Sequence, residues 1–229
     1  NQNDEFVIKD EIKGDYFIID EASMIGENLW KDIQKFSLPI VLIGDPGQLE
    51  PLYDDPKLMS KPDWTLHEIH RQAKDNGIIQ FATDIRLKNS LKEIYENVKF
   101  NEYADIEDLK SADIVICGFN NTRCKINNYL RKIRGFKDVL NKGEQIVILK
   151  NNTHAGVFNG QILTIDKIIE EKENKIIVSC SGIGAEPLKL QLDKFQFGKE
   201  RIADFKLFRM NRKIVFADYG YCITCHKSQ

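Results

Sequence analysis

Short apolar runs alternate with amphipathic stretches over roughly the first 140 residues of this chain. Three runs are each short enough to be a buried parallel strand, which is apolar on both faces: 16–20, 39–44 and 113–119. Three stretches repeat apolar residues every three or four positions, which predicts helices: 26–36, 77–88 and 121–133. Strands and helices in this alternation predict an α/β fold.

Two of the predicted helices carry more specific expectations. In the first, the apolar side chains share one face: Ile25, Leu29, Ile33 and Phe36. In the third, the exposed face is expected to carry four basic side chains: Arg123, Lys125, Arg131 and Lys132. Residues 65–68 are expected to form a short strand, and the proline-rich residues 45–63 an irregular loop.

After Gly143 the apolar residues alternate with polar ones, the period of a half-buried strand. About five short strands over about seventy residues, separated by turns rich in Asn, Gly and Lys, predict a compact antiparallel barrel. Residues 214–224 are then expected to return to the parent sheet. The alternating apolar positions are Ile146, Ile148, Leu163, Ile165, Ile168, Ile176, Val178, Leu188, Leu190 and Leu192.

Bulk composition neither supports nor excludes a nucleic-acid partner. The chain has 33 Lys and Arg against 35 Asp and Glu, a net charge of -2. No apolar run approaches the roughly 18–20 residues that span a bilayer, and the polar N-terminus has no signal-peptide pattern. We therefore expect a soluble cytoplasmic protein without a membrane partner.

The five cysteines are scattered and odd in number, which argues against a disulfide scaffold. Residues 222–226 do spell the haem-attachment pattern Cys-x-x-Cys-His. Covalent haem attachment belongs to exported proteins, and a zinc site would need two further ligands at matching spacing. We expect neither haem nor zinc.

The polar groups that follow the first two strands carry the candidate chemistry. Asp20 and Glu21 follow one strand, and residues 44–48 (Gly-Asp-Pro-Gly-Gln) follow the next. In open α/β sheets the ligand crevice lies at such strand ends. Asp20 there suits a Mg²⁺ ion that bridges to phosphates, Glu21 can polarise an attacking water, and Gln48 can sense a γ-phosphate. Polar caps on two core strands are the alternative.

These two strand ends resemble motif II (Walker B) and motif III of superfamily 1 helicases, most closely the RecD-like group with its small phage helicases. Four further segments resemble the family in the same order, so the resemblance spans nearly the whole chain. They are a motif IV-like segment at 64–72, a strand-plus-Asn element at 116–121, the start of a small β-barrel at 158–161, and a motif V-like end at 224–229.

The resemblance implies two partial RecA-like P-loop motor domains, with an SH3-like β-barrel inserted in the second. Residues 1–63 would be the C-terminal part of the first domain, and residues 64–142 the first part of the second. Residues 143–213 would be the barrel insertion, and residues 214–229 the return to the second domain.

The resemblance also implies a Mg-ATP site. Asp20 would bind Mg²⁺, and Glu21 would orient or activate water. Asp45 would support the motif III loop, and Gln48 would report the γ-phosphate. Arg71 would contact the transferring phosphoryl group once the domains close. The alternatives are a simple turn residue for Asp45 and a surface arginine for Arg71.

Two groups of residues would contact single-stranded DNA. One group offers a stacking face and backbone contacts, and the other contacts phosphates without reading bases. Phe119 could instead lie in the core, His226 could be a satisfied strand-end histidine, and Trp64 could cover an adenine or simply pack the loop. The first group is Phe119, Asn120 and Asn121, and the second is Thr224, His226, Lys227 and Gln229.

The phosphate-loop pattern Gly-x-x-x-x-Gly-Lys-Ser/Thr and motif VI do not occur in the sequence. We therefore expect an internal piece of a longer ATP-dependent DNA helicase, inactive alone, from a bacterial or phage-infected cell. The intact protein would couple Mg-ATP hydrolysis to 5′→3′ translocation and duplex unwinding in replication, recombination or repair. The alternatives are another P-loop NTPase, such as a remodeller, or a nucleic-acid-binding module that does not hydrolyse ATP.

Overall fold

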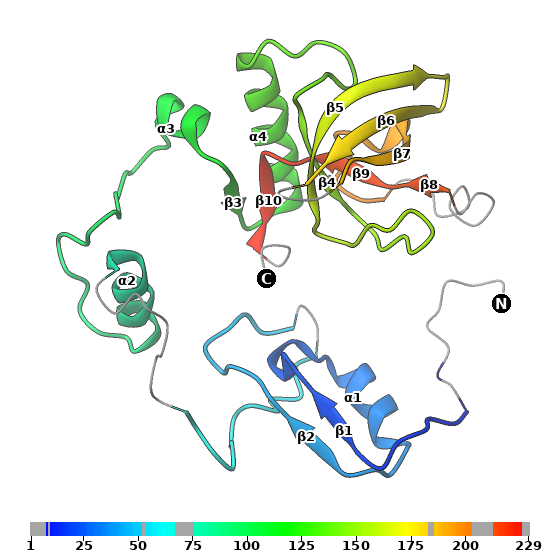
Figure 1. Cartoon of the computed structure of the whole chain (residues 1–229). Coiled ribbons are helices and arrows are strands. Elements are labelled where there is room, and N and C mark those ends of the chain that lie inside the picture. Colours follow the sequence, from blue (N-terminus) through cyan, green and yellow to red (C-terminus); the bar gives the residue numbers. More distant parts are fainter. Residues whose placement is uncertain are drawn as a thin grey trace. The chain divides into compact units, whose positions relative to one another are not determined.

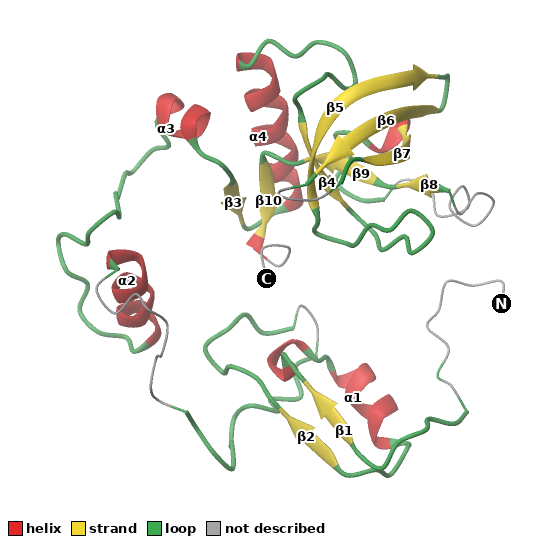
Figure 2. Cartoon of the chain, viewed as in Figure 1, coloured by secondary structure: helices red, strands yellow, loops and turns green. Residues whose placement is uncertain are grey.

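The structure is a computed structural model that describes residues 8, 10–51, 54–66, 76–182, 186–202 and 213–225. The chain divides into two compact units, Asn1–Phe100 and Asn101–Gln229. Figure 1 labels their helices and strands, and Figure 2 shows that both units mix the two kinds of element. Within this described part, no helix is long and apolar enough to cross a membrane.

The first unit is built on two parallel strands, β1 (Phe17–Ile19) and β2 (Ile40–Leu42). A short 3₁₀ turn, η1 (Ala22–Met24), and helix α1 (Glu27–Gln34) connect them. Figure 1 shows α1 beside the two strands. The strand–helix–strand order predicted for residues 16–44 is therefore confirmed.

Apolar side chains of this unit remain on the surface. Ile18 and Val41, which face each other in the register of β1 and β2, are 61% and 50% exposed. Leu29, on the apolar face expected for α1, is 55% exposed. Parallel sheets are normally covered on both faces. One face of this strand pair is thus apolar and uncovered by the described residues.

Helix α2 (Gly77–Arg86) confirms the helix predicted at 77–88. The Phe81 ring meets Tyr95 and Phe100 edge to face, with ring centroids 5.3 and 5.0 Å apart. At the helix start, a Cβ on Gly77 would lie 2.0 Å from the carbonyl oxygen of Glu96, so only glycine allows this approach. These contacts fix α2 against the segment that follows it.

The described half of the strand expected at residues 65–68 is not a strand. Thr65 and Leu66 have no strand pairing. The other two residues of that expected strand lie outside the described residues.

The second unit contains a parallel pair, β3 (Val115–Cys117) and β10 (Cys222–Thr224). Helix α3 (Ile106–Ser111) precedes β3, and helix α4 (Asn120–Ile133) follows it and packs on the pair. The strand predicted at 113–119 and the helix predicted at 121–133 are confirmed.

A six-stranded sheet makes up most of this unit, in the order β8-β7-β6-β5-β4-β9. Residues 214–219 pair with β7 in their first part and with β4 in their last part, so one segment bonds both edges and closes the sheet into a barrel (Figure 1). We call this sheet the barrel. Its strands are β4 (Gln145–Ile148), β5 (Ile162–Glu171), β6 (Lys175–Ser181), β7 (Leu188–Asp193), β8 (Ile214–Val215) and β9 (Ala217–Tyr219), with the 3₁₀ turn η2 (Lys194–Gln196) after β7.

This closure corrects one expectation. Residues 214–224 do not return together to the parent sheet, because β8 and β9 complete the barrel and only β10 pairs with β3. The short alternating strands are confirmed, and their identity with an SH3-like insertion stays a prediction.

The interior of the barrel is filled by the alternate residues of its strands. In β6, Ile176, Val178 and Cys180 are at most 1% exposed, while the residues between them are half-buried. Leu130 of α4 and Tyr221 belong to the same cluster of buried side chains. The barrel and α4 therefore share one core.

Of the arginines expected on the exposed face of α4, Arg123 is buried and Arg131 is half-buried. Arg123 is 3% exposed and pairs with Asp218 of β9, which is 1% exposed. The Arg131 Nε donates to Glu144 Oε1 at 2.5 Å, and Glu144 is fully buried. The helix turns this face toward the barrel, where buried carboxylates offset the cost of desolvating the guanidinium groups.

Candidate functional site

The carboxyl ends of β1 and β2 bring the first set of candidate residues together. Ile43 N donates to Ile19 O at 2.8 Å, and Ala22 N donates to Ile43 O at 2.9 Å. Residues 20–21 and 44–48 therefore lie side by side, as expected for adjacent parallel strands. We call this the first edge. Gly44 allows the approach, since a Cβ there would lie 3.1 Å from Ser23 N.

The acidic pair of the first edge is exposed and has an unusual backbone. Glu21 has φ 53° and ψ 39°, a left-handed conformation that is uncommon for non-glycine residues. Its amide donates to Asp20 Oδ1 at 2.9 Å. The Asp20 Oδ2 accepts no hydrogen bond from a described residue. One available carboxylate oxygen fits Mg²⁺, which keeps most of its waters and binds through one or two carboxylates.

The loop of residues 44–48 is organised by Asp45. Its Oδ1 accepts from Gly47 N at 2.8 Å, and its carbonyl accepts from Gln48 N at 3.1 Å. Gln48 is half-buried at this edge. Asp45 also forms an ion pair with Arg86 of α2, which the sequence reasoning missed. Nothing in the local pattern links two residues 41 positions apart.

The carboxyl ends of β3 and β10 form a second edge. Thr224, the last residue of β10, pairs in register with Cys117, and the chain leads from Cys117 into Phe119. Phe119 is 76% exposed and so is not a core residue, and Asn120 and Asn121 are exposed beside it. Thr224 is 8% exposed. Thr224 thus lies at the same edge as Phe119, Asn120 and Asn121, about a hundred residues earlier in the chain.

The second edge also carries the N-terminus of α4. Phe119 occupies the cap position without a side-chain hydrogen bond, and the first turn of the helix has no acidic residue. Unpaired N–H groups and the helix dipole make such an end suitable for a phosphate.

A buried ion pair orients Asn120 at this edge. The Arg123 Nε donates to Asn120 Oδ1 at 3.1 Å. The same guanidinium bonds Asp218 of the barrel, and its Nη2 donates to the carbonyl of Lys199 at 2.9 Å. Arg123 therefore connects the second edge to the barrel. The sequence did not predict this role, because Arg123 was expected to be exposed.

Trp64 and four residues outside the described part complete the set of candidates. Trp64 is 88% exposed, so the described residues do not pack around it. Four others lie outside the described residues: Arg71, His226, Lys227 and Gln229.

Two of the cysteines lie together between the strands of the second edge. The Cys222 Sγ is 3.6 Å from the Cys117 Sγ. Burial, followed by the hydrogen bond to Cys117, raises the pKa of the Cys222 thiol to about 12. Cys222 is thus a neutral thiol of the core at ordinary pH, which suits a packing role.

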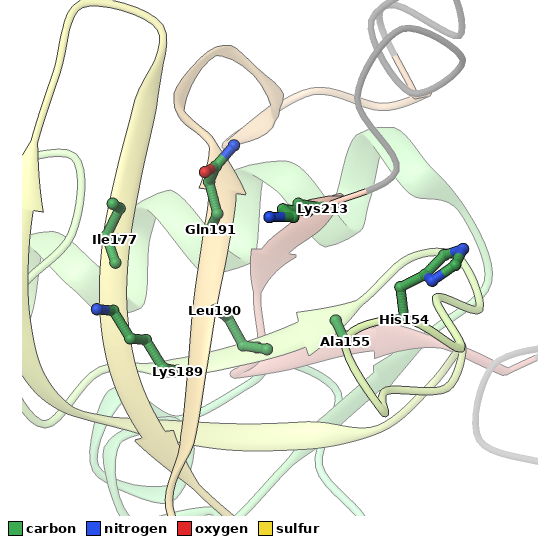
Figure 3. A pocket seen from close by; sticks show the side chains of 7 residues that line it. All are labelled: His154, Ala155, Ile177, Lys189, Leu190, Gln191 and Lys213. Atoms are coloured by element: carbon green, nitrogen blue, oxygen red, sulfur yellow. The ribbon is translucent and has the colours of Figure 1, made fainter.

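The barrel carries a pocket of about 630 Å³. Figure 3 shows the charged end of Lys189 near Ile177, that of Lys213 near Gln191, and the His154 ring apart from both. The basic groups do not converge on one point, so the pocket is not arranged as a single-anion site. Its lining residues are His154, Ala155, Ile177, Lys189, Leu190, Gln191 and Lys213.

No family model matches the chain. Among solved structures, it is similar to the Pif1 helicase from Bacteroides in complex with ADP-AlF3 and single-stranded DNA, with a TM-score of 0.54 and 17% identity over 95% of this chain. A structure of Bacteroides Pif1 bound to single-stranded DNA matches with a TM-score of 0.56 and 17% identity over 94% of this chain. The chain therefore shares its fold with these Pif1 structures.

A third structure, of two coordinating Pif1 helicases at forked double-stranded DNA, matches with a TM-score of 0.55 and 19% identity over 100% of this chain. The chain spans 62% of the length of the first two Pif1 chains and 65% of the third, less than two thirds in each case. The mixed α/β structure thus matches part of the fold of these Pif1 chains.

Proposed function

We propose that this chain is an internal part of an ATP-dependent DNA helicase of the RecD-like group. The intact cytoplasmic protein would couple Mg-ATP hydrolysis to 5′→3′ movement on single-stranded DNA and to duplex unwinding. One observation carries the proposal: the parallel pair β1–β2 brings Asp20 and Glu21 beside residues 44–48 in a chain with a helicase fold.

The first edge has the groups that ATP hydrolysis needs. Asp20 would hold Mg²⁺, which neutralises charge on the phosphates when it is bound. Glu21 would accept a proton from the attacking water or orient it. Gln48, positioned by the turn of Asp45, would contact the γ-phosphate. Arg71 would contribute positive charge from the second motor domain.

The second edge is suited to a single-stranded backbone. Phe119 offers an exposed ring for stacking, while Asn120, Asn121 and the α4 N-terminus offer donors to phosphates. Thr224 would add a hydroxyl, and His226, Lys227 and Gln229 would continue the contact. The structures that resemble this chain hold single-stranded DNA in two cases, which supports this assignment.

We further propose two partial RecA-like domains, with the barrel as an SH3-like insertion in the second. The uncovered apolar face of β1 and β2 supports the view that more of the first domain exists in the intact protein. Since the phosphate-loop pattern is not in this sequence, we expect negligible ATPase activity from the chain alone. A nucleic-acid-binding module without hydrolysis, or another P-loop NTPase, is the competing assignment.

The test compares wild-type intact protein with two variants. Glu21→Gln should lower the ATP turnover by about 10²-fold or more, because the amide keeps the shape and loses the base, while ATP affinity stays within about twofold. Phe119→Ala should weaken single-stranded DNA affinity by roughly 5-fold or more for all base sequences, since base stacking is lost.

Phe195→Ala is the matched control, because Phe195 is also an exposed ring (59%) of the second unit but belongs to η2 and not to the carboxyl end of β3 or β10. It should leave DNA affinity unchanged. Normal ATP turnover in Glu21→Gln would refute the assignment of the first edge. Equal losses in Phe119→Ala and Phe195→Ala would refute that of the second.

A further inference from the structure

Arg86 reaches from the last turn of α2 to the loop of the first edge. Its Nη1 donates to Asp45 Oδ2 at 2.9 Å, and its Nη2 donates to Asp45 Oδ1 at 2.5 Å. A guanidinium bound through two parallel hydrogen bonds fixes both the distance and the orientation of a carboxylate. The contact therefore determines where the Asp45 side chain points.

The Asp45 carboxylate in turn organises the residues that follow it. The oxygen that accepts from Arg86 Nη2 also accepts from Gly47 N, and the Asp45 carbonyl accepts from Gln48 N. A Cβ on Gly47 would lie 2.7 Å from Arg86 Nε and 2.9 Å from Arg86 Cζ. The guanidinium thus lies against the loop backbone while it holds the carboxylate.

The helix that carries Arg86 is itself anchored. Tyr95 Oη donates to Asp84 Oδ2 at 2.9 Å, and the rings of Phe81, Tyr95 and Phe100 pack together. Asn89, then Tyr95, lowers the pKa of Asp84 by hydrogen bonding, which keeps this carboxylate charged as an acceptor. Arg86 therefore extends from a fixed support to the loop.

We propose that Arg86 is a positioning residue of the first edge, which holds Asp45 and so sets the place of Gln48 at the γ-phosphate. The nucleotide part of this inference rests on the proposed function, whereas the ordering of the loop does not. Exposed ion pairs contribute little to global stability. The expected effects are therefore local: on the order of the loop and on the turnover of the nucleotide.

The ordering of the loop can be tested by amide hydrogen exchange, measured on this 229-residue chain. Arg86→Gln should speed exchange at Gly47 and Gln48 by about 3- to 10-fold, because their acceptors lose their support. Gly47→Ala should displace the guanidinium without deleting a charge and speed exchange at Gln48 similarly. Lys88→Gln removes the same charge from an exposed position just after α2 and should change neither amide.

Exchange rates in Arg86→Gln within about twofold of the wild-type rates would overturn the proposal. So would an equal acceleration in Lys88→Gln, because the effect would then follow from net charge and not from the contact with Asp45.

Steady-state ATP turnover of the intact helicase tests the functional part. Arg86→Gln should lower kcat by about 5-fold or more and leave KM for ATP within about twofold, since the groups assigned to nucleotide binding are unchanged. Arg86→Lys should recover part of kcat, because it keeps the charge and loses the paired donors. Adding Asp45→Asn to Arg86→Gln should lower kcat little further, as expected for two partners of one contact.

The two possible failures are distinguishable. An intact wild-type protein without ATP turnover would refute the proposed function and leave the exchange result standing. Two other results, with normal wild-type turnover, would refute the role of Arg86 only. One is a loss of kcat in the double variant equal to the sum of the losses in Arg86→Gln and Asp45→Asn, expressed as free energies. The other is a change in KM for ATP without a change in kcat in Arg86→Gln.

Discussion

A buried ion pair between Arg123 of α4 and Asp218 of β9 connects the helix to the barrel. Asp218 Oδ2 accepts from Arg123, and Asp218 Oδ1 accepts from Gly198 N and Tyr219 N, both at 2.8 Å. Removing one partner leaves a buried charge uncompensated. We therefore expect Asp218→Asn to lower the free energy of unfolding of the second unit by about 3 kcal/mol, measured by urea denaturation of the chain. The exposed Asp138→Asn should change it by less than about 0.5 kcal/mol, and a similar loss in both variants would contradict the buried-pair explanation.

Two buried ionisable side chains in the strands of the barrel make its stability sensitive to high pH. Burial raises the pKa of Cys180 in β6 from 9.0 to about 12 and that of Tyr219 in β9 from 10.0 to about 12. Both groups lose a proton more readily in the unfolded state, so their stabilisation is complete below about pH 9 and is lost as the pH rises toward 12. We expect the melting temperature of the barrel to fall by about 5 °C or more between about pH 8 and about pH 10.5.

A matched pair of variants in β6 tests this origin of the alkaline sensitivity. Cys180→Ala removes an ionisable group and should flatten the dependence of melting temperature on pH. Val178→Ala, a buried neighbour on the same face, should lower the melting temperature at every pH and keep the wild-type slope. If melting temperature falls with pH equally steeply in the wild type and both variants, ionisation of Cys180 does not cause the alkaline sensitivity.

At the scale of the whole molecule, the two units differ in how much apolar surface they bury. Among the described apolar residues of the first unit, only Ala22, Ile25 and Tyr95 are buried, whereas the second unit encloses the core of the barrel and α4. We expect residues 101–229 to fold alone, with a melting temperature within about 3 °C of the upper transition of the full chain in scanning calorimetry. A fragment without a cooperative transition would show that the barrel depends on the first unit.

Local pattern by itself determined the kind and order of most elements. The strand–helix–strand order of residues 16–44, the helices α2 and α4, and the change to alternating strands after Gly143 follow from the spacing of apolar residues. The spacing is a local property, because each side chain's direction depends only on its own helix or strand. The meeting of residues 20–21 with residues 44–48 was also predictable, since adjacent parallel strands end at the same edge.

Tertiary structure alone decided which polar groups are partners. The sequence places Arg123 and Arg131 on a helix but does not say that this face meets the barrel, where Asp218 and Glu144 are buried. It contains no sign that residues 214–219 bond both edges of the barrel sheet, or that Arg86 holds Asp45. These contacts join residues 13 to 95 positions apart. They form only when packing of the core brings distant elements together, so no local periodicity could have revealed them.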